Sequence, residues 1–303
     1  MNKVNEDILG GVPMHAYLKA VGFSDISSRS DMEKVLRDVI TNCDSKKVVE
    51  DEEHHLFVEI SREYGYDCGL TICGELDEED NLHIDYCFPF YRGSKVTSQE
   101  NLMVERHVDK ISYAGACDDY RVGITLIFYL LNAAEYQSEK SKKSFRDPSI
   151  SLTLSALSRK GMILLPLKKE GKKDIDQEWK QHNELIAAAR NGDEEAMENL
   201  TMEEINTYST ISRRIRKKDD VLTIVDSYFM PYGIECDQYS VMGDIIEYDT
   251  TVNEYTGEKL HLITILCNDI ELDICINDQD LTGIPEVGRR FKGVIWLLGE
   301  INF

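Results

Sequence analysis

Residues 239–277 read YSVMGDIIEYDTTVNEYTGEKLHLITILCNDIELDICIN, which is the pattern of several strands in succession. Helical periodicity disappears after residue 221, and apolar and β-branched side chains gather in runs that are typical of strands. The expected strands cover residues 239–252, 259–268 and 270–277. Thr256-Gly257 lies in the connection between the first two strands, and Asn268-Asp269 indicates a tight turn between the second and the third.

A further apolar run at residues 288–299 completes a small all-β module, to which we assign residues 221–303. Successive strands in so short a stretch, with glycines near their ends, are similar to an OB-like barrel. Gly243 and Gly299 stand where the strands of such a barrel would bend sharply. The C-terminal part is therefore predicted to be a small, OB-like barrel.

The N-terminal part, residues 1–170, combines helical and strand patterns, so the predicted fold class is α+β with a mixed α/β-sheet domain. Ser30 and Glu33 have the spacing of a capping box and favour a helix within residues 14–42. Strands are expected at residues 55–64, 67–76, 82–90 and 102–113. The acidic turn at residues 77–81 would join two of them as a hairpin.

Two further elements are expected before residue 170. Residues 119–140 are apolar nearly all round in their first half, which predicts a buried helix packed across the sheet. Residues 152–167 indicate a second hairpin that turns at Arg159-Lys160-Gly161. The charged stretch 168–174 marks the first boundary. Residues 171–220 form the predicted helical connecting segment, in which Thr201 and Glu204 make a capping box.

The composition points to a cytoplasmic protein. The chain has 34 Lys and Arg against 56 Asp and Glu, a net charge of −22, which disfavours binding to phosphate backbones and to anionic membranes. None of its eight cysteines forms a CxxC pair, and several lie inside strand-like runs, as reduced, buried cysteines do. The first residues have no apolar leader, and the apolar run 122–134 is too short to cross a membrane.

Motifs that carry chemistry are missing from the sequence. Asp278-x-Asp280-x-Thr282-Gly283 begins like a calcium-binding loop, but its twelfth position is Arg289, so a simple turn is favoured. There is no GxSxG, no GxxxxGK[ST] and no GxGxxG opening a helix. We therefore expect no metal, no cofactor and no catalytic residue that the sequence alone can assign.

Three segments resemble an uncharacterised family of hypothetical proteins from anaerobic Firmicutes. They read MHAYLKAVGF at residues 14–23, FMPYGIECDQY at 229–239 and GRRFKGVIWL at 288–297. The likeness spans nearly the whole chain. It implies a bacterial cytoplasmic protein of unknown function, and it carries no activity, cofactor or site residue.

The leading functional hypothesis is a non-enzymatic protein that binds another protein or acts as a scaffold. It is motivated by the missing catalytic motifs and by aromatic residues in the C-terminal module, namely Tyr228, Phe229, Tyr232, Tyr239, Phe291 and Trp296. If these side chains are core residues, the hypothesis loses that motivation. The sequence assigns no oligomeric state.

The second hypothesis is a small-molecule enzyme with its pocket between the two domains, where converging groups of perturbed pKa would be found. The candidate residues for that cleft or for a partner patch are Arg92, Glu105, His107, Cys236, Asp237, Arg289 and Arg290. The third hypothesis, single-stranded nucleic-acid binding, relies on the basic run 289–292. Residues 221–303 hold 15 acidic and 4 basic side chains, and this excess of acids argues against it.

Overall fold

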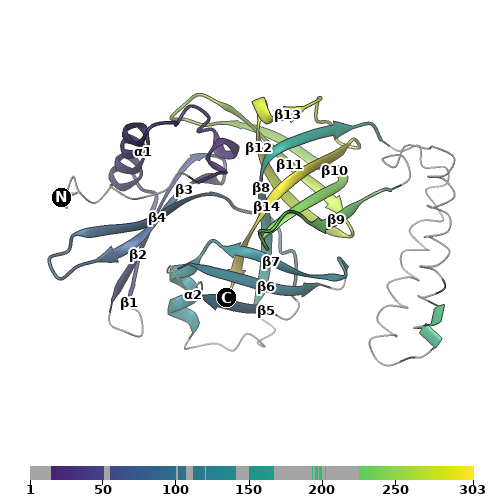
Figure 1. The fold of residues 1–303 in the computed structure, drawn as a ribbon, viewed down its shortest axis with the longest axis horizontal. Coiled ribbons are helices and arrows are strands. Elements are labelled where there is room, and N and C mark those ends of the chain that lie inside the picture. The colour runs from purple at the N-terminus through teal and green to yellow at the C-terminus, as the bar shows by residue number, and fades with distance from the viewer. Residues whose placement is uncertain are drawn as a thin grey trace. The chain divides into compact units, whose positions relative to one another are not determined.

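The computed structural model describes residues 15–50, 55–99, 102–106, 112–119, 121–140, 150–166, 193, 195–196, 198–199, 202 and 225–303. Two compact units divide the chain, one made of Met1–Leu165 with Ser227–Phe303 and the other of Pro166–Asp226. All the elements below belong to the first unit. The described residues form fourteen strands and two α-helices, so the fold is mostly β and contains a barrel (Figure 1). The helical connecting segment predicted at residues 171–220 lies almost wholly outside the described residues.

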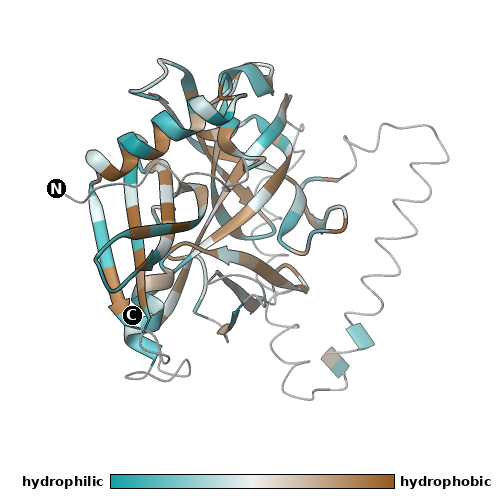
Figure 2. Cartoon of the chain, turned by 60° about the vertical axis from the view of Figure 1, so that its left-hand side comes forward, coloured by the Kyte–Doolittle hydropathy of each residue, from teal (hydrophilic) through white to brown (hydrophobic). Residues whose placement is uncertain are grey.

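The first sheet is a four-stranded antiparallel meander. Its strands, in spatial order, are β1 (Ser45–Glu50), β2 (Leu56–Gly65), β3 (Cys68–Leu76) and β4 (Leu82–Tyr91). The predicted hairpin at residues 77–81 is confirmed, because the Asp77 carboxylate accepts hydrogen bonds from the backbone N–H groups of Glu79 and Asn81. Hydrophilic and hydrophobic residues alternate along strands of this sheet (Figure 2), as expected when its two faces have different surroundings.

One face of this sheet is covered by α1 (Arg29–Thr41), whose Met32, Val35, Leu36 and Val39 are buried. The helix predicted within residues 14–42 is shorter than expected. A 3-10 turn, η2 (Leu18–Val21), ends at Gly22, whose φ of 89° stops the helix. The N-cap of α1 is Ser28 rather than Ser30, and its hydroxyl accepts from the Asp31 N–H at 3.1 Å.

The second sheet contains the other strands. They are β5 (Leu102–Arg106), β6 (Tyr113–Asp119), β7 (Ile124–Leu130), β8 (Ser151–Leu164), β9 (Tyr228–Pro231), β10 (Gln238–Val252), β11 (Lys259–Cys267), β12 (Ile270–Asn277), β13 (Leu281–Thr282) and β14 (Arg290–Asn302). Their order is β13-β8-β12-β11-β10-β14-β7-β6-β5, with β9 on β10. Because β14 also pairs with β8, the strands β8, β12, β11, β10 and β14 close into a five-stranded barrel.

The strands predicted at residues 239–277 are confirmed as β10, β11 and β12. Asn268 and Asp269 both have positive φ, 49° and 59°, which is the backbone of a tight two-residue hairpin turn. The glycines have a packing role as well. A Cβ at Gly299 would lie 2.3 Å from Cδ2 of Phe128, so the glycine leaves room for that buried ring.

The hairpin predicted at residues 152–167 is wrong, because these residues form the single long strand β8. Gly161 does not turn the chain. A Cβ there would lie 2.5 Å from Cε2 of Phe291, so this glycine allows β8 and β14 to pack closely. β8 pairs with β14 from Ser151 to Leu164 and also runs parallel to β12. Strands from residues 1–170 and from residues 221–303 therefore share one sheet.

The helix predicted at residues 119–140 is also wrong in its first half. Residues 124–130 form β7, and only Ala133–Lys140 form a helix, α2. The run Ile-Thr-Leu-Ile-Phe-Tyr-Leu is short and rich in β-branched and aromatic residues, and such a run suits a buried strand as well as a helix. Neither this helix nor any other in the described part of the chain has the length and apolar character needed to span a bilayer.

Candidate functional site

A polar pocket lies on the face of the four-stranded sheet opposite α1. Arg62 and Tyr64 of β2 reach Asp38 of α1, so the alternation along β2 turns Glu59 and Ser61 to the other face. The pocket encloses ≈ 340 Å³ of empty volume, which includes its opening to solvent. Its lining residues are Ser45, Lys47, Glu59, Ser61, Thr71, Phe90, Arg92, Leu131, Asn132 and Glu300.

The register of the sheet explains why polar side chains meet here. Lys47 of β1 lies opposite Glu59 of β2, and Ser45 lies opposite Ser61 in the neighbouring row. Ser61 in turn lies opposite Thr71 of β3, and their hydroxyl oxygens are 2.9 Å apart. Directly opposed residues share a face of the sheet, so these two rows form the floor of the pocket.

Glu59 is the most buried acid of the pocket, with 6% of its surface exposed. Its Oε2 accepts a hydrogen bond of 3.2 Å from the Ala134 N–H, in the first turn of α2. Burial raises the pKa of Glu59 to about 7, against the opposing effects of the Ala134 N–H, Lys47 and Arg92. Near neutral pH this carboxyl therefore exists in both protonation states.

Glu300 enters the same pocket from β14, in the second sheet. It is half-buried, and within the described part of the chain its carboxyl makes no hydrogen bond and no ion pair. Burial raises the pKa of Glu300 above its usual value, against the opposing charge of Arg92, and the charge of Glu135 adds to the rise. Two carboxyls that hold protons more tightly than usual thus line one pocket.

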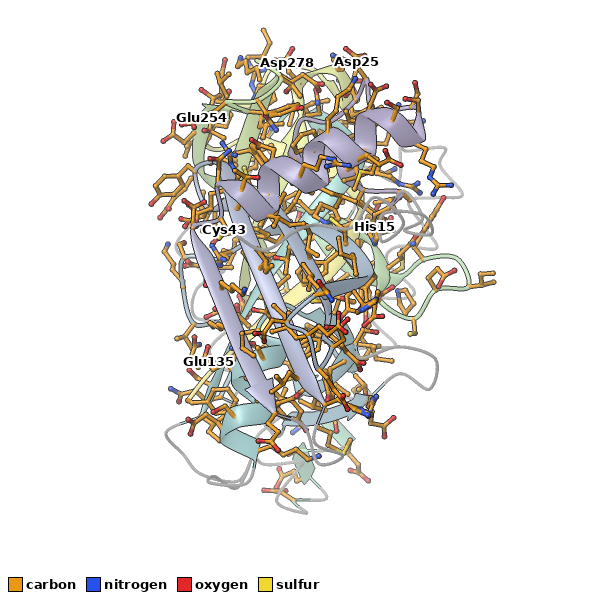
Figure 3. All side chains as sticks on the ribbon, turned by 90° about the vertical axis from the view of Figure 1, so that its left-hand side faces the viewer. His15, Asp25, Cys43, Glu135, Glu254 and Asp278 are labelled. Carbon is orange, nitrogen blue, oxygen red and sulfur yellow. The ribbon has the colours of Figure 1, made fainter. Side chains whose placement is uncertain are left out.

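The two cations of the pocket are paired with other carboxylates. Lys47 Nζ lies 3.2 Å from Oε2 of Glu135, a residue of α2 that Figure 3 shows near the lower end of the four-stranded sheet. Arg92 Nη1 lies 2.6 Å from Oε1 of Glu63, and its guanidinium carbon lies 4.3 Å from the centre of the Phe90 ring. The cations therefore form the walls of the pocket and do not neutralise Glu59 or Glu300 by direct contact.

Asn132 fixes the position of β14 beside the pocket. Its Nδ2 donates to the carbonyl oxygen of Ile301 at 2.8 Å, and its Oδ1 accepts from the Ile301 N–H at 3.1 Å. The Asn132 amide thus pairs with both backbone groups of Ile301, as a neighbouring strand would. This pairing fixes the backbone next to Glu300.

The pocket has the groups needed for proton transfer. A carboxyl with a pKa near the working pH can act as a general acid or a general base, and a second carboxyl beside it can take the other role. No group of three or more His, Cys, Asp or Glu side chains suited to a metal ion occurs among the described residues.

The residues predicted from the sequence as a site do not come together. Arg92 lines the pocket, whereas Glu105 is exposed on β5. His107 lies outside the described residues. Asp237 accepts a 2.7 Å hydrogen bond from the indole Nε1–H of Trp296, and Cys236 beside it is exposed.

The two arginines of that predicted patch also have structural partners. Arg289 pairs with Glu286 at 2.9 Å and donates to the carbonyl oxygen of Ile284. Arg290 is 3% exposed, and its Nε donates to the carbonyl oxygen of Leu165. The basic run 289–292 therefore does not offer an open pair of guanidinium groups to a phosphate.

Sequence reasoning missed Glu59 and Glu300. The available signal for Glu59 was a single acid inside the apolar strand Leu56–Gly65, where an ionised side chain is costly. Glu300 gave a similar signal between Gly299 and Ile301 in β14. Their meeting in one pocket depends on how two sheets pack, which a single sequence does not reveal.

The aromatic residues that motivated the protein-binding hypothesis are mostly core residues. Phe229, Tyr239, Phe291 and Trp296 are buried, and Tyr228 is half-buried. Tyr232 and Ile234 lie in the connection between β9 and β10 and are 49% and 98% exposed, and Met230 of β9 is 51% exposed. The module also exposes Val252, Ile284 and Val287, so its exposed apolar side chains are spread over several parts of the module.

The acidic turn that begins like a calcium-binding loop has protein partners. Asp278 Oδ1 lies 2.8 Å from Nε2 of His261, whose Nδ1 lies 2.9 Å from the hydroxyl of Tyr248. Burial lowers the pKa of His261, with its hydrogen bond to Asp278 acting in the opposite direction. A neutral imidazole can donate from Nε2 to Asp278 and accept at Nδ1 from Tyr248, so both ring nitrogens have partners and the network stabilises one end of the barrel.

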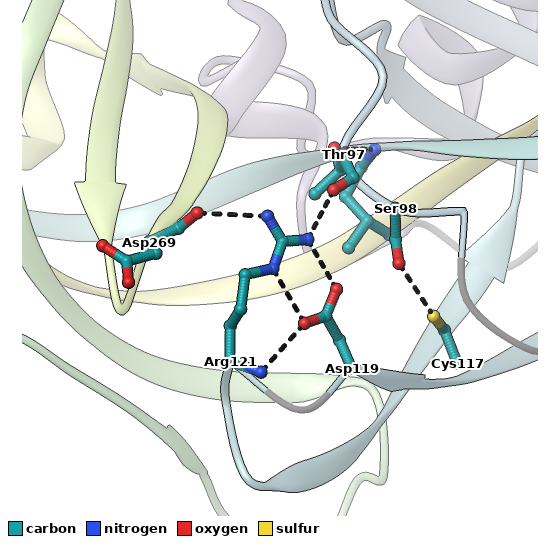
Figure 4. Close-up of polar contacts among 7 residues, drawn as sticks. Thr97, Ser98, Cys117, Asp119, Arg121 and Asp269 are labelled. Atoms are coloured by element: carbon teal, nitrogen blue, oxygen red, sulfur yellow. Dashed lines mark hydrogen bonds and ion pairs between the residues drawn. The ribbon is translucent and has the colours of Figure 1, made fainter. Parts of the chain in front are cut away.

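A second buried network surrounds Arg121, and Figure 4 shows its contacts. The guanidinium forms a two-pronged pair with Asp119, through Nε to Oδ1 at 2.9 Å and Nη2 to Oδ2 at 2.6 Å. It also donates to the carbonyl oxygens of Thr97 and Asp269. Arg121 thus links the end of β6 to the β11–β12 turn.

The cysteines provide a direct test of the fold. All eight fall in the described part of the chain, and only Cys236 is exposed, while Cys43 is half-buried and the others are buried. In the native protein we expect the aromatic disulfide reagent DTNB to modify one thiol per chain in a fast phase. Cys236→Ser should remove this phase and Cys43→Ser should leave it. A fast phase that survives in Cys236→Ser would contradict this arrangement.

A family model described as "Domain of unknown function, E. rectale Gene description (DUF3881)" matches residues 18–299. This match confirms the resemblance to an uncharacterised family that the sequence indicates. No match was found among curated proteins or among solved structures.

Proposed function

The chain belongs to this family of unknown function, and from that premise we propose that its pocket binds a small polar molecule and exchanges a proton with it through Glu59. The observation that carries the proposal is the pair of carboxyls, Glu59 from one sheet and Glu300 from the other, in one open pocket. A strongly perturbed carboxyl in a cleft is a common mark of a functional site.

The cost of Glu59 to the fold supports the same conclusion. Its one hydrogen bond within the described part of the chain, from the Ala134 N–H, could equally be accepted by the amide oxygen of a glutamine. With glutamine at this position, the fold would avoid the free-energy cost of burying an ionised carboxylate. A residue that makes the fold less stable than a close substitute is typical of a site retained for function.

The test is a binding survey with the full chain at neutral pH. Small organic cations, carboxylic acids, polyols and amino acids would each be titrated, with binding followed by calorimetry and by two-dimensional NMR. We expect one class to bind, and Glu59→Gln and Glu300→Gln to weaken that binding at least about tenfold. The matched control is Glu271→Gln, an exposed acid of β12 paired with Lys95, which should bind like the wild type. The proposal fails if no class binds or if the control loses as much affinity.

Protein binding is the second candidate, and the β9–β10 connection favours it. Ile234 is 98% exposed at this turn, between the half-exposed Tyr232 and the exposed Cys236. Exposed apolar residues gathered in this way are a common feature of contact surfaces. The small size of this surface makes the pocket the better supported site.

An OB-like classification of the barrel draws support from its five closed strands. Single-stranded nucleic-acid binding has weaker support, since such barrels use basic side chains and stacking aromatics on an open face. In this barrel Arg290, Phe291 and Trp296 are all buried.

A further inference from the structure

We propose that the group recognised by the pocket is a compact primary ammonium group, free or at the end of a small amine, and that it enters in exchange for a proton. This inference rests on the proposed function and narrows it to one class of ligand. It follows from the charges, the hydrogen-bonding groups and the size of the pocket.

The charges around the pocket leave room for a cation. Each basic side chain is already paired with a carboxylate that is not one of the two converging acids, Lys47 with Glu135 and Arg92 with Glu63. Glu59 and Glu300 therefore remain without a direct cationic partner among the described residues. When both are ionised, four acids face two bases, and a single positive charge reduces this imbalance. A bound anion would face both carboxylates and increase it.

Some of the acceptors that line the pocket receive no hydrogen bond from the described residues, because Lys47 and Arg92 pair with other carboxylates. Within the described part of the chain, Oε1 of Glu59, the Glu300 carboxyl and the hydroxyl of Ser45 make no hydrogen bond. Glu59 is more than nine-tenths buried and lines the pocket, so a group bound there can donate to its second oxygen. An ammonium group has three N–H donors and no acceptor, which matches two carboxyls and one hydroxyl.

The size and the walls of the pocket favour a small group. Its ≈ 340 Å³ of empty volume includes open solvent, so the enclosed part is smaller and suits only a compact group. Leu131 and Phe90 are its apolar lining residues and could contact a short alkyl chain. Arg92 already lies over the Phe90 ring, so a broad aromatic cation has no matching face to stack on.

Binding of an ammonium group should be coupled to proton release. The raised pKa of Glu59, about 7, means that near neutral pH part of the population must lose a proton before the carboxylate can pair with a cation. If one proton leaves, affinity should rise by up to about tenfold for each pH unit below that value and level off above it. Affinity for a neutral ligand would not follow this course.

The experiment is isothermal titration calorimetry of the full chain with ethylammonium chloride, repeated with potassium chloride, sodium acetate and glycerol. Titrations at pH 6, 7 and 8 in two buffers of different ionisation enthalpy count the protons released. We expect ethylammonium to bind roughly tenfold more tightly at pH 8 than at pH 6, with proton release that Glu59→Gln abolishes. Glu271→Gln should leave both affinity and proton release unchanged.

The outcomes separate this inference from the function on which it rests. If acetate or glycerol binds in a manner that depends on Glu59, the ammonium assignment is overturned and the pocket keeps its proposed function. Potassium binding as tight as that of ethylammonium would also overturn it, because potassium has the charge without the N–H donors. If the pocket binds none of the probes and no class in the wider survey, both proposals fall.

Discussion

Glu59→Gln is expected to raise the free energy of unfolding by roughly 3 kcal/mol at pH 8 and to change it little at pH 4.5. The reason is the burial of Glu59, which raises its pKa from the usual 4.5 to about 7 in the folded protein. Between these two values the unfolded chain loses its proton while the folded protein still holds it. The contribution of this group to stability is therefore complete below pH 4.5 and is lost as the pH rises through about 7.

The glutamine remains neutral at every pH and can still accept the Ala134 hydrogen bond, so the variant avoids this loss. Urea unfolding at intervals from pH 4.5 to 8 would measure the difference between variant and wild type. Glu271→Gln, at an exposed ion pair with Lys95, should show no comparable dependence on pH. A gain that is the same at every pH would show that Glu59 is not buried as an acid. The same variant should lose ligand binding while gaining stability, so a loss of binding could not be blamed on misfolding.

Arg121→Met is expected to lower the free energy of unfolding by about 3–5 kcal/mol at pH 7. Asp119 is 2% exposed and would keep its charge in the interior with no cation beside it. Burial favours the neutral form of Asp119, but in the wild type the hydrogen bonds and charge of Arg121 outweigh burial and hold its pKa below the usual value. The loss should therefore shrink as the pH falls toward 3.8, where the isolated acid can take up a proton.

Two further variants make this result specific. Asp119→Asn combined with Arg121→Met removes the unpaired charge and should recover a large part of the lost stability. Lys95→Met removes a cation that pairs with Glu247 and Glu271 at the surface, and it should cost far less stability than Arg121→Met. Equal losses of stability in Arg121→Met and Lys95→Met would contradict the role of Arg121 as the link between Asp119 and the β11–β12 turn.

The strands that sequence reasoning predicted well have signals that depend only on neighbours. β10, β11 and β12 are rich in β-branched residues and are joined by turns with typical residues, such as Asn268-Asp269. β7 was mistaken for a helix because apolar residues occupy both of its faces, so its sequence lacks the polar alternation that marks a strand, even though its burial alternates. β8 was divided in two because Arg159-Lys160-Gly161 resembles a turn, whereas Gly161 serves the packing of Phe291.

The candidate site was harder to predict, since its two acids lie 241 positions apart, at residues 59 and 300. Each is a single acid in an apolar strand, and local patterns identify such an acid as costly without showing what it faces. Arg92 was the one predicted residue that lines the pocket. The rest of the predicted patch was chosen by residue type, and Arg290 and Asp237 turn out to be engaged with Leu165 and Trp296.

The closure of the barrel by β8 and β14 also determines the order in which the protein can assemble during synthesis. The meander β1–β4 pairs only strands that follow one another, so it can fold soon after it leaves the ribosome. β8 must wait for β14, since Ser151 pairs with Asn302 and Leu164 with Arg290. Until β14 is synthesised, the edges of β7, β8 and β10 that pair with it in the folded protein have no partner. The nascent chain therefore has to be kept from pairing these edges with other chains.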